Sequence, residues 1–100
     1  MKQEEINTND YLKSIVLNLP ESPGIYQYLD VESTIIYVGK SKNLKRRVSS
    51  YFNREHPNGK TRVLVSKIAD IRYIVVNTED DALLLENNLI KKYRPRYNVL

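Results

Sequence analysis

The chain has 100 residues, of which 41% are hydrophobic and 28% charged, and its formal net charge is +4. This balance is typical of one globular domain and argues against an intrinsically disordered chain. The absence of cysteine excludes a disulfide framework and a cysteine-ligated zinc site. No apolar run approaches the roughly 20 residues of a membrane span, and the polar start is not a signal peptide, so we expect a soluble, cytoplasmic protein.

The beginning of the chain predicts a tail and a short amphipathic segment. Residues 1–9 are mostly polar and predict a loose tail, and residues 11–20 form an amphipathic segment that ends at a proline. We therefore expect residues 1–16 to precede a single domain that spans residues 17–100.

A β-hairpin follows. Residues 24–29 and 34–39 alternate between apolar and polar side chains as strands do, and a turn-forming stretch separates them. A four-residue loop would set Tyr26 opposite Tyr37 and would pair the glycines at the two ends of the hairpin. Both phenols would then lie on one face of the sheet.

The middle of the chain predicts two helices. Residues 43–52 carry apolar side chains at helical spacing, with Ser41 or Asn43 as the N-cap. Those apolar residues are Leu44, Val48, Tyr51 and Phe52. We expect the second helix to carry Val63, Leu64 and Ile68.

A third strand and a last helix complete the pattern. Residues 71–76 are β-branched and predict a strand. The last helix is predicted to begin after the cap Thr78, with acids in its first turn, and to stop before Pro95. The order β-β-α-α-β-α indicates an α/β (α+β) fold, in which helices flank a three-stranded antiparallel sheet.

The positive charge gathers in the middle of the sequence. The stretch from Lys40 to Arg72 holds ten Lys or Arg residues against two acidic residues. Within it, the block "KSKNLKRR" either forms a solvated helix face or contacts phosphates, which supply most of the nonspecific affinity for nucleic acid.

Glu86 differs from the other acids of the last helix. Its neighbours three and four residues away are Ala82, Leu83, Leu89 and Ile90, all of them apolar. An unpaired carboxylate buried in such a stripe costs several kcal/mol, so Glu86 needs a cation, a hydrogen-bond partner or a metal. A structural ion pair and a functional carboxylate remain equally open at this point.

Several motifs together resemble the GIY-YIG nuclease family. "GIY" at 24–26 and "YVG" at 37–39 look like the two halves of its signature, with Val38 in place of the usual isoleucine. "LPESPGIY" and the closing run "EDDALLLENNLIKKYRPRYN" extend the match, which covers about residues 17–100. Within the family, these motifs resemble the N-terminal domain of UvrC proteins.

The resemblance implies a divalent-metal-dependent DNA endonuclease with the GIY-YIG fold. It implies that the domain makes the 3′ incision near a lesion in bacterial nucleotide excision repair, on damaged double-stranded DNA. The partner UvrB would be loaded through UvrA–UvrB damage recognition and contacted by other regions of a longer chain, of which we expect this sequence to be a fragment.

The resemblance also implies a set of site residues. Carried over position by position, the active site would contain Tyr26, Tyr37, Lys40, Arg47, Glu86 and Asn98. Glu86 would hold a single Mg²⁺ or Mn²⁺, since hard cations prefer carboxylate oxygens. The remaining cations of the basic block, Lys42, Lys45 and Arg46, would hold the DNA backbone.

Each of these side chains has an expected task. Arg47 would contact the scissile phosphate and stabilise developing charge. Tyr37 is favoured over Tyr26 as general base, and we expect Lys40, Arg47 and the metal to lower its pKa from the usual value near 10. Asn98 would orient its neighbours by hydrogen bonds.

Two other functions fit the same sequence. One is a stand-alone GIY-YIG nuclease of the repair or homing type, which downstream domains would exclude. The other is a non-catalytic nucleic-acid-binding module, in which the basic block alone binds DNA and no metal-dependent cleavage occurs.

Overall fold

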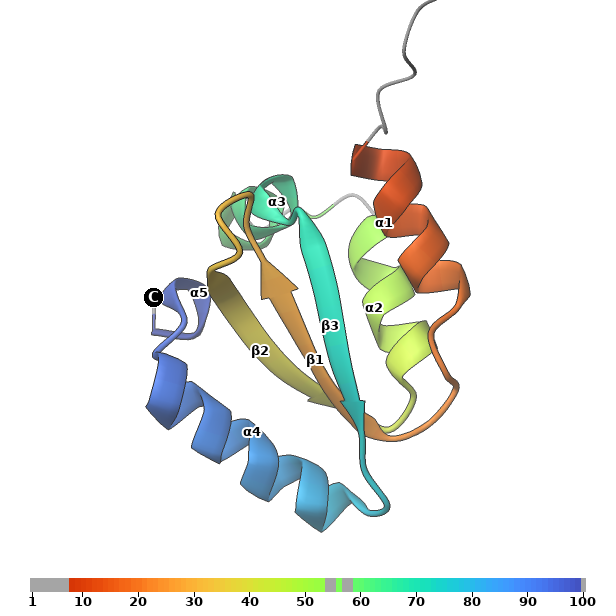
Figure 1. Cartoon of the computed structure of the whole chain (residues 1–100), viewed down its shortest axis with the longest axis vertical. Coiled ribbons are helices and arrows are strands. Elements are labelled where there is room, and N and C mark those ends of the chain that lie inside the picture. The colour runs from red at the N-terminus through yellow and green to blue at the C-terminus, as the bar shows by residue number, and fades with distance from the viewer. Residues whose placement is uncertain (1–7, 54–55, 57–58, 100) are drawn as a thin grey trace, which may run out of the picture.

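The computed structural model describes residues 8–53, 56 and 59–99. Three strands form one antiparallel sheet in the order β2-β1-β3, and helices flank it (Figure 1). The elements are α1 (Thr8–Leu17), β1 (Gly24–Leu29), β2 (Ile35–Ser41), α2 (Leu44–Phe52), α3 (Gly59–Lys67), β3 (Asp70–Val75), α4 (Glu79–Tyr93) and α5 (Arg96–Val99). The predicted sheet and the order β-β-α-α-β-α are confirmed, with α1 before this series and α5 after it.

Helix α1 belongs to the packed structure. It begins at Thr8, so the prediction of a loose tail is wrong for residues 8–9, while residues 1–7 lie outside the described residues. Leu12 is buried in the core that α2 shares, and the Tyr11 hydroxyl donates a 2.8 Å hydrogen bond to the carboxylate of Asp70. Because an amphipathic helix gains most of its stability by burying its apolar stripe, α1 packs against the rest of the domain.

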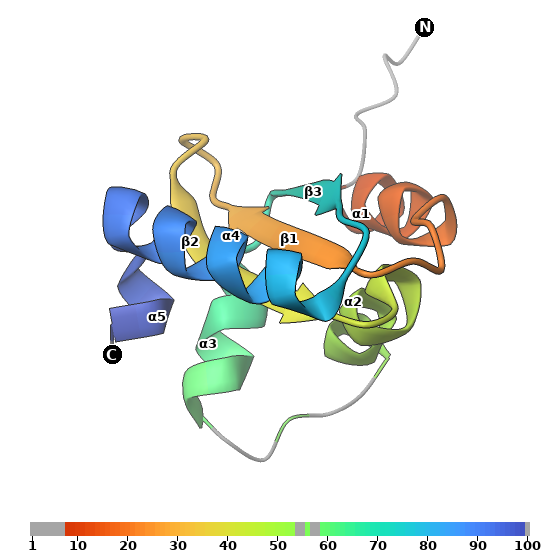
Figure 2. The ribbon, with the colours of Figure 1, turned by 90° about the horizontal axis from the view of Figure 1, so that it is seen from below.

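Helices cover both faces of the sheet (Figures 1 and 2). On one face, Tyr26 and Tyr28 of β1 pack with buried residues of α1, α2 and α3. On the other face, Ile25 of β1 and Val38 of β2 pack against Ala82 of α4. Side chains alternate along a strand, so neighbouring residues of β1 contribute to different cores.

The register of the hairpin differs from the prediction. Tyr37 faces Tyr28, and Tyr26 faces Gly39, so the predicted pairing of Tyr26 with Tyr37 is wrong by two residues. The connection is longer than four residues and the ladder is irregular after Tyr28, because the Asp30 carboxylate accepts hydrogen bonds from two backbone N–H groups of the turn. A shift of two residues leaves every side chain on its face, so the prediction that both phenols share one face is confirmed.

Tyr26 requires the glycine that stands opposite it. The ring of Tyr26 lies over Gly39, and a Cβ added at that position would overlap with the ring and its hydroxyl. The missing side chain lets the ring lie across β2, with its hydroxyl directed to α2.

Side-chain caps set the first residues of α2 and α4. Asn43 accepts a 3.0 Å hydrogen bond from the N–H of Arg46, which decides between the two predicted caps of α2. Thr78 caps α4 as predicted and accepts from the N–H of Asp81 at 3.1 Å. None of the described helices is long and apolar enough to cross a membrane.

The second predicted helix is present with two corrections. Helix α3 contains Val63 and Leu64, but only Leu64 is buried, and Val63 is 46% exposed. Ile68 is buried one residue beyond the end of the helix. The helix contributes the buried Leu64 and the partly buried Val65 to the core, and Ile68 follows from the loop to β3.

Tyr28→Phe is expected to raise the free energy of unfolding by about 1 kcal/mol, because it removes a buried polar group without a partner. The Tyr28 hydroxyl is buried and has no hydrogen-bond partner among the described residues. Urea denaturation measures the change, with Tyr26→Phe as the matched control that loses a hydrogen bond and is expected to be less stable. Destabilisation by Tyr28→Phe would show that its hydroxyl is satisfied, for example by a buried water.

Candidate active site

Two tyrosines and an arginine meet where β1 contacts α2. The hydroxyl oxygens of Tyr26 and Tyr51 are 3.2 Å apart and share a buried hydrogen bond. The Arg47 Nε–H donates to the Tyr26 hydroxyl at 3.4 Å, and its guanidinium carbon lies 5.4 Å from the centre of the Tyr51 ring. Arg47 and Tyr51 are one helical turn apart, so α2 presents both side chains to the same strand.

Tyr37 joins this group from the edge strand β2. Its ring centre lies 6.2 Å from that of Tyr26 and 6.4 Å from that of Tyr51. A cavity of about 220 Å³ opens beside it, lined among others by Tyr37, Tyr51 and Tyr97. The structure thus brings together three of the predicted site residues, Tyr26, Tyr37 and Arg47.

Sequence reasoning missed Tyr51 as a member of the site. Its spacing from Leu44 and Val48 assigned it to the apolar face of α2, and it is indeed buried. The available signal was its position four residues after Arg47, which places a phenol beside a guanidinium on one helix face. A phenol can serve both roles, since its ring packs while its hydroxyl bonds.

The protein's own groups raise the pKa of the site tyrosines. Burial is the largest cause for Tyr37 and raises its pKa to about 12, with the charges of Tyr51 and Glu86 acting in the same direction. Burial also raises the pKa of Tyr26, against the hydrogen bond from Arg47. Arg47 acts to lower the pKa of Tyr37, as predicted, but its effect is smaller than that of the loss of solvent, so the net shift from the protein's own groups is upward. The predicted contribution of the metal stays a prediction.

Glu86 is half-buried at the middle of α4. Its side chain forms no hydrogen bond or ion pair with any residue that the structure describes, so the structural ion pair that the sequence left open is absent there. Its negative charge acts to raise the pKa of Tyr37 and is the smallest of the contributing effects. The described residues hold no cluster of three or more His, Cys, Asp or Glu, so Glu86 is a solitary carboxylate whose oxygens are available to a hard cation.

Asn98 binds the backbone of the edge strand β2. Its side-chain oxygen accepts from the N–H of Val38 at 2.8 Å, and its side-chain N–H donates to the carbonyl of Val38 at 2.9 Å. One amide side chain thus satisfies both backbone groups of a residue on an edge strand. Asn98 thus holds the strand beside Tyr37, and its orienting task in a reaction stays a prediction.

The predicted basic residues lie at the end of β2, at the start of α2 and in the short connection between them. Lys40 is exposed on β2 and makes no hydrogen bond or ion pair with a described residue. Lys42 forms a 3.2 Å ion pair with Glu79, in which both side chains are largely exposed. Such a pair contributes about 0–1 kcal/mol, so phosphate can displace it at little cost. Lys45 and Arg46 lie in the first turn of α2, where Lys45 is half-buried and Arg46 exposed.

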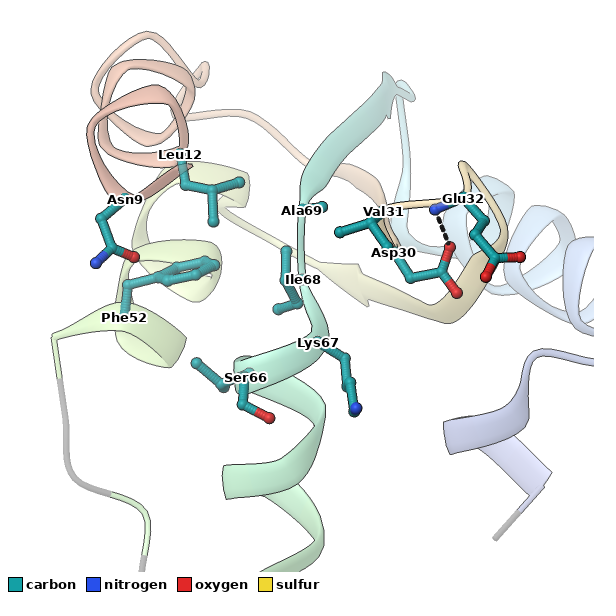
Figure 3. A pocket seen from close by; sticks show the side chains of 11 residues that line it. Asn9, Leu12, Asp30, Val31, Glu32, Phe52, Ser66, Lys67, Ile68 and Ala69 are labelled. Carbon is teal, nitrogen blue, oxygen red and sulfur yellow. Dashed lines mark hydrogen bonds between the residues drawn. The ribbon is translucent and has the colours of Figure 1, made fainter. Parts of the chain in front are cut away.

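A second, wider groove of about 700 Å³ lies between α1, the β1–β2 turn and the end of α3 (Figure 3). None of the predicted site residues lines it. The carboxylate of Asp30 in this groove accepts hydrogen bonds from the N–H groups of Glu32 and Thr34, at 2.9 and 3.0 Å. That carboxylate therefore stabilises the turn.

The chain matches the model of the UvrC-like GIY-YIG domain family over residues 22–99. It is 79% identical over 97 residues to UvrABC system protein C of Bacteroides fragilis, which covers 97% of this chain and 16% of that protein. It is 63% identical over 93 residues to the protein of the same name from Porphyromonas gingivalis, again covering 16% of its length. The chain thus spans about a sixth of the length of the curated relatives that it matches.

Solved structures of a related domain have the same fold. The GIY-YIG N-terminal endonuclease domain of UvrC from Thermotoga maritima, bound to magnesium as its catalytic divalent cation, is 38% identical to this chain with a TM-score of 0.79. That match covers 88% of this chain and 96% of the other. A Tyr-to-Phe mutant of the same domain, also bound to its catalytic cation, has a TM-score of 0.81 at 37% identity and covers 91% of this chain and 98% of the other.

Tyr37→Phe is expected to reduce the loss of stability at alkaline pH. The folded pKa of Tyr37, about 12, is above the value near 10 of an unfolded chain, so its contribution is fully present below pH 10 and is lost as the pH rises toward 12. Thermal unfolding between pH 8 and 12 measures this, with Tyr73→Phe on the exposed strand β3 as the matched control. Parallel curves for the wild type and Tyr37→Phe would contradict the raised pKa.

Proposed function

This chain belongs to the family of UvrC-like GIY-YIG domains, and on that premise we propose that it is a divalent-metal-dependent endodeoxyribonuclease domain. Its reaction is the 3′ incision of damaged double-stranded DNA in bacterial nucleotide excision repair. The observation that carries the proposal is the solitary Glu86, a half-buried carboxylate of α4 without an ion-pair partner among the described residues.

Glu86 fits a single Mg²⁺ or Mn²⁺. A hard cation of this kind accepts one carboxylate oxygen and keeps several waters, so it does not need a cluster of acids. When bound, the ion supplies positive charge that polarises a phosphate oxygen and favours ionisation of nearby water and phenol. The magnesium in the related Thermotoga maritima domain supports the same class of cofactor.

The chain's own side chains divide the remaining work. Arg47 contacts the scissile phosphate and stabilises its developing charge, and its Nε–H anchors the guanidinium to the Tyr26 hydroxyl. Tyr26 and Tyr51 share one hydrogen bond, so each holds the other's hydroxyl in a fixed orientation beside that phosphate.

Tyr37 is the general base of the proposed reaction. Its phenol is only half-buried, and its pKa is raised to about 12, whereas Tyr26 is buried and its pKa is raised beyond the value for Tyr37. Less burial leaves less free energy to overcome before the phenolate forms and takes a proton from water. Asn98 holds the strand that carries Tyr37, through both backbone groups of Val38.

The basic block binds the backbone of the substrate. Lys40 contacts phosphate at the edge of β2, and Lys42, Lys45 and Arg46 bind it along the start of α2. UvrB, loaded through damage recognition by UvrA and UvrB, would deliver the damaged strand. Other regions of the full-length protein would contact UvrB. Because the proposed substrate is chromosomal DNA of a bacterium, we expect the protein to act in the cytoplasm. The similarity to UvrABC system proteins favours this assignment over a stand-alone or homing nuclease, and Glu86 favours it over a non-catalytic module.

Glu86→Gln is expected to abolish metal-dependent incision and to leave the fold intact, because the amide keeps the shape of the side chain but loses its charge. The domain replaces the equivalent part of Bacteroides fragilis UvrC, and 3′ incision is measured on a lesion-bearing duplex with UvrA and UvrB. Calorimetry of Mn²⁺ binding gives a second readout. Asp80→Asn, an exposed acid of the same helix, is the control. Incision at the wild-type rate by Glu86→Gln would remove Glu86 from the mechanism.

Arg47→Ala is expected to lower the rate of incision by about 10²–10³-fold at saturating DNA, the usual cost of removing a donor to developing charge. Single-turnover kinetics separate this step from DNA binding. Arg46→Ala, the exposed neighbour, is expected to change affinity alone. A change confined to affinity in Arg47→Ala as well would make Arg47 a simple phosphate anchor.

A further inference from the structure

A second group of cations lies at the C-terminal end of α4, whereas the acids of this helix lie in its first turn. It consists of Lys91, Lys92, Arg94 and Arg96, all exposed, and is called here the α4–α5 cluster. From residue 87 to residue 99 the chain contains no acidic residue. Among the described residues, no ion pair neutralises any of the four. The cluster is therefore an uncompensated positive surface, separate from the basic block of α2.

The cluster adjoins the cavity that Tyr37 and Tyr51 line. The guanidinium carbon of Arg96 lies 5.9 Å from the centre of the Tyr97 ring, and Tyr97 lines the cavity that Tyr37 and Tyr51 also line. Two residues after Arg96, Asn98 binds the backbone of β2. Short helix α5 thus attaches the cluster to the strand that carries Tyr37.

Arg94 has a backbone conformation that disfavours its side chain. It ends α4 with φ 45° and ψ 57°, and its N–H donates to the carbonyl of Ile90 at 2.8 Å. This left-handed cap is most often glycine, because a Cβ is crowded there. A glycine would make the same backbone hydrogen bond without strain, so the exposed guanidinium of Arg94 needs a reason other than the cap.

Compensation of the helix dipole explains only part of the cluster. Lys91 and Lys92 lie in the last turn of α4, where positive charge stabilises a helix. Arg94 and Arg96 lie beyond the last turn, and the effect of the dipole falls off there.

Helix α4 separates the basic block of α2 from the α4–α5 cluster, and Glu86 lies between them. Its 15 residues extend over about 22 Å, at 1.5 Å per residue. Its first residue, Glu79, pairs with Lys42 of the basic block, and the cluster begins in its last turn with Lys91 and Lys92. Figure 2 shows α2 and α5 at opposite ends of α4. Glu86 is the eighth residue of this helix, midway between them.

We propose that the α4–α5 cluster is a second phosphate-binding site, which contacts the DNA backbone on the far side of the scissile phosphate from the basic block of α2. This inference rests on the proposed function. With phosphates about 3.4 Å apart along the axis, 22 Å of α4 corresponds to about six base pairs between the two contacts. The DNA is thus held on both sides of the bond near Glu86.

The test measures binding of the 100-residue chain to a 25-base-pair duplex in EDTA, over a series of salt concentrations. Arg94→Gly is expected to weaken binding several-fold and to lower the slope of log K against log salt by about 0.9, the value for one lost phosphate contact. The same variant is expected to have a higher Tm, because glycine relieves the left-handed cap. Arg94→Gly with Arg96→Gln is expected to lower the slope by about twice as much.

Arg72→Gln is the matched control. Arg72 is an exposed cation on β3, which lies at the edge of the sheet opposite β2, and its loss is expected to leave the slope unchanged. The second site would be overturned if both Arg94 variants kept the wild-type salt slope, or if Arg72→Gln lowered the slope by as much as they do. Absence of DNA binding by the wild-type chain would also overturn it. Because the binding assay contains no metal, its result is independent of incision. Normal DNA binding by Arg94→Gly, together with loss of incision in Glu86→Gln, would reject the second phosphate-binding site but support the proposed nuclease function.

Discussion

The packing of the Tyr26 ring over Gly39 is the contact on which the site depends. It requires a strand position without a side chain, and it directs a phenol from the centre of the sheet toward α2. There the hydroxyl meets Tyr51 and Arg47, which one turn of α2 supplies together. The three elements that form the site are thus connected through one aromatic residue of the central strand.

Burial gives this site order and makes its proton chemistry harder. Tyr26, Tyr28, Tyr37 and Tyr51 contact one another through their rings, and this packing holds the hydroxyls in place. The same loss of solvent raises the pKa of Tyr37 to about 12, which is further above neutral pH than the usual value near 10. In the proposed reaction, a metal ion held by Glu86 would supply positive charge that favours the phenolate.

Helix α4 organises charge along its length. Acids occupy its first turn, one carboxylate lies at its middle, and cations follow its last turn. A single straight element therefore relates the basic block of α2, the candidate metal ligand and the α4–α5 cluster. The amide of Asn98, just beyond this helix, closes the arrangement by binding the edge strand.

The sequence by itself determined the three strands, the helices α2, α3 and α4, the cap of α4 and the faces of the strands, because helical periodicity, side-chain alternation and capping hydrogen bonds act between residues close in the chain. It also isolated Glu86, whose neighbours on the helix were all apolar. Only the tertiary structure decided the register of the hairpin, the membership of Tyr51 and the direction of the pKa shift of Tyr37. Each of these depends on which distant segments cover a residue, and burial by distant segments leaves no local pattern in the sequence.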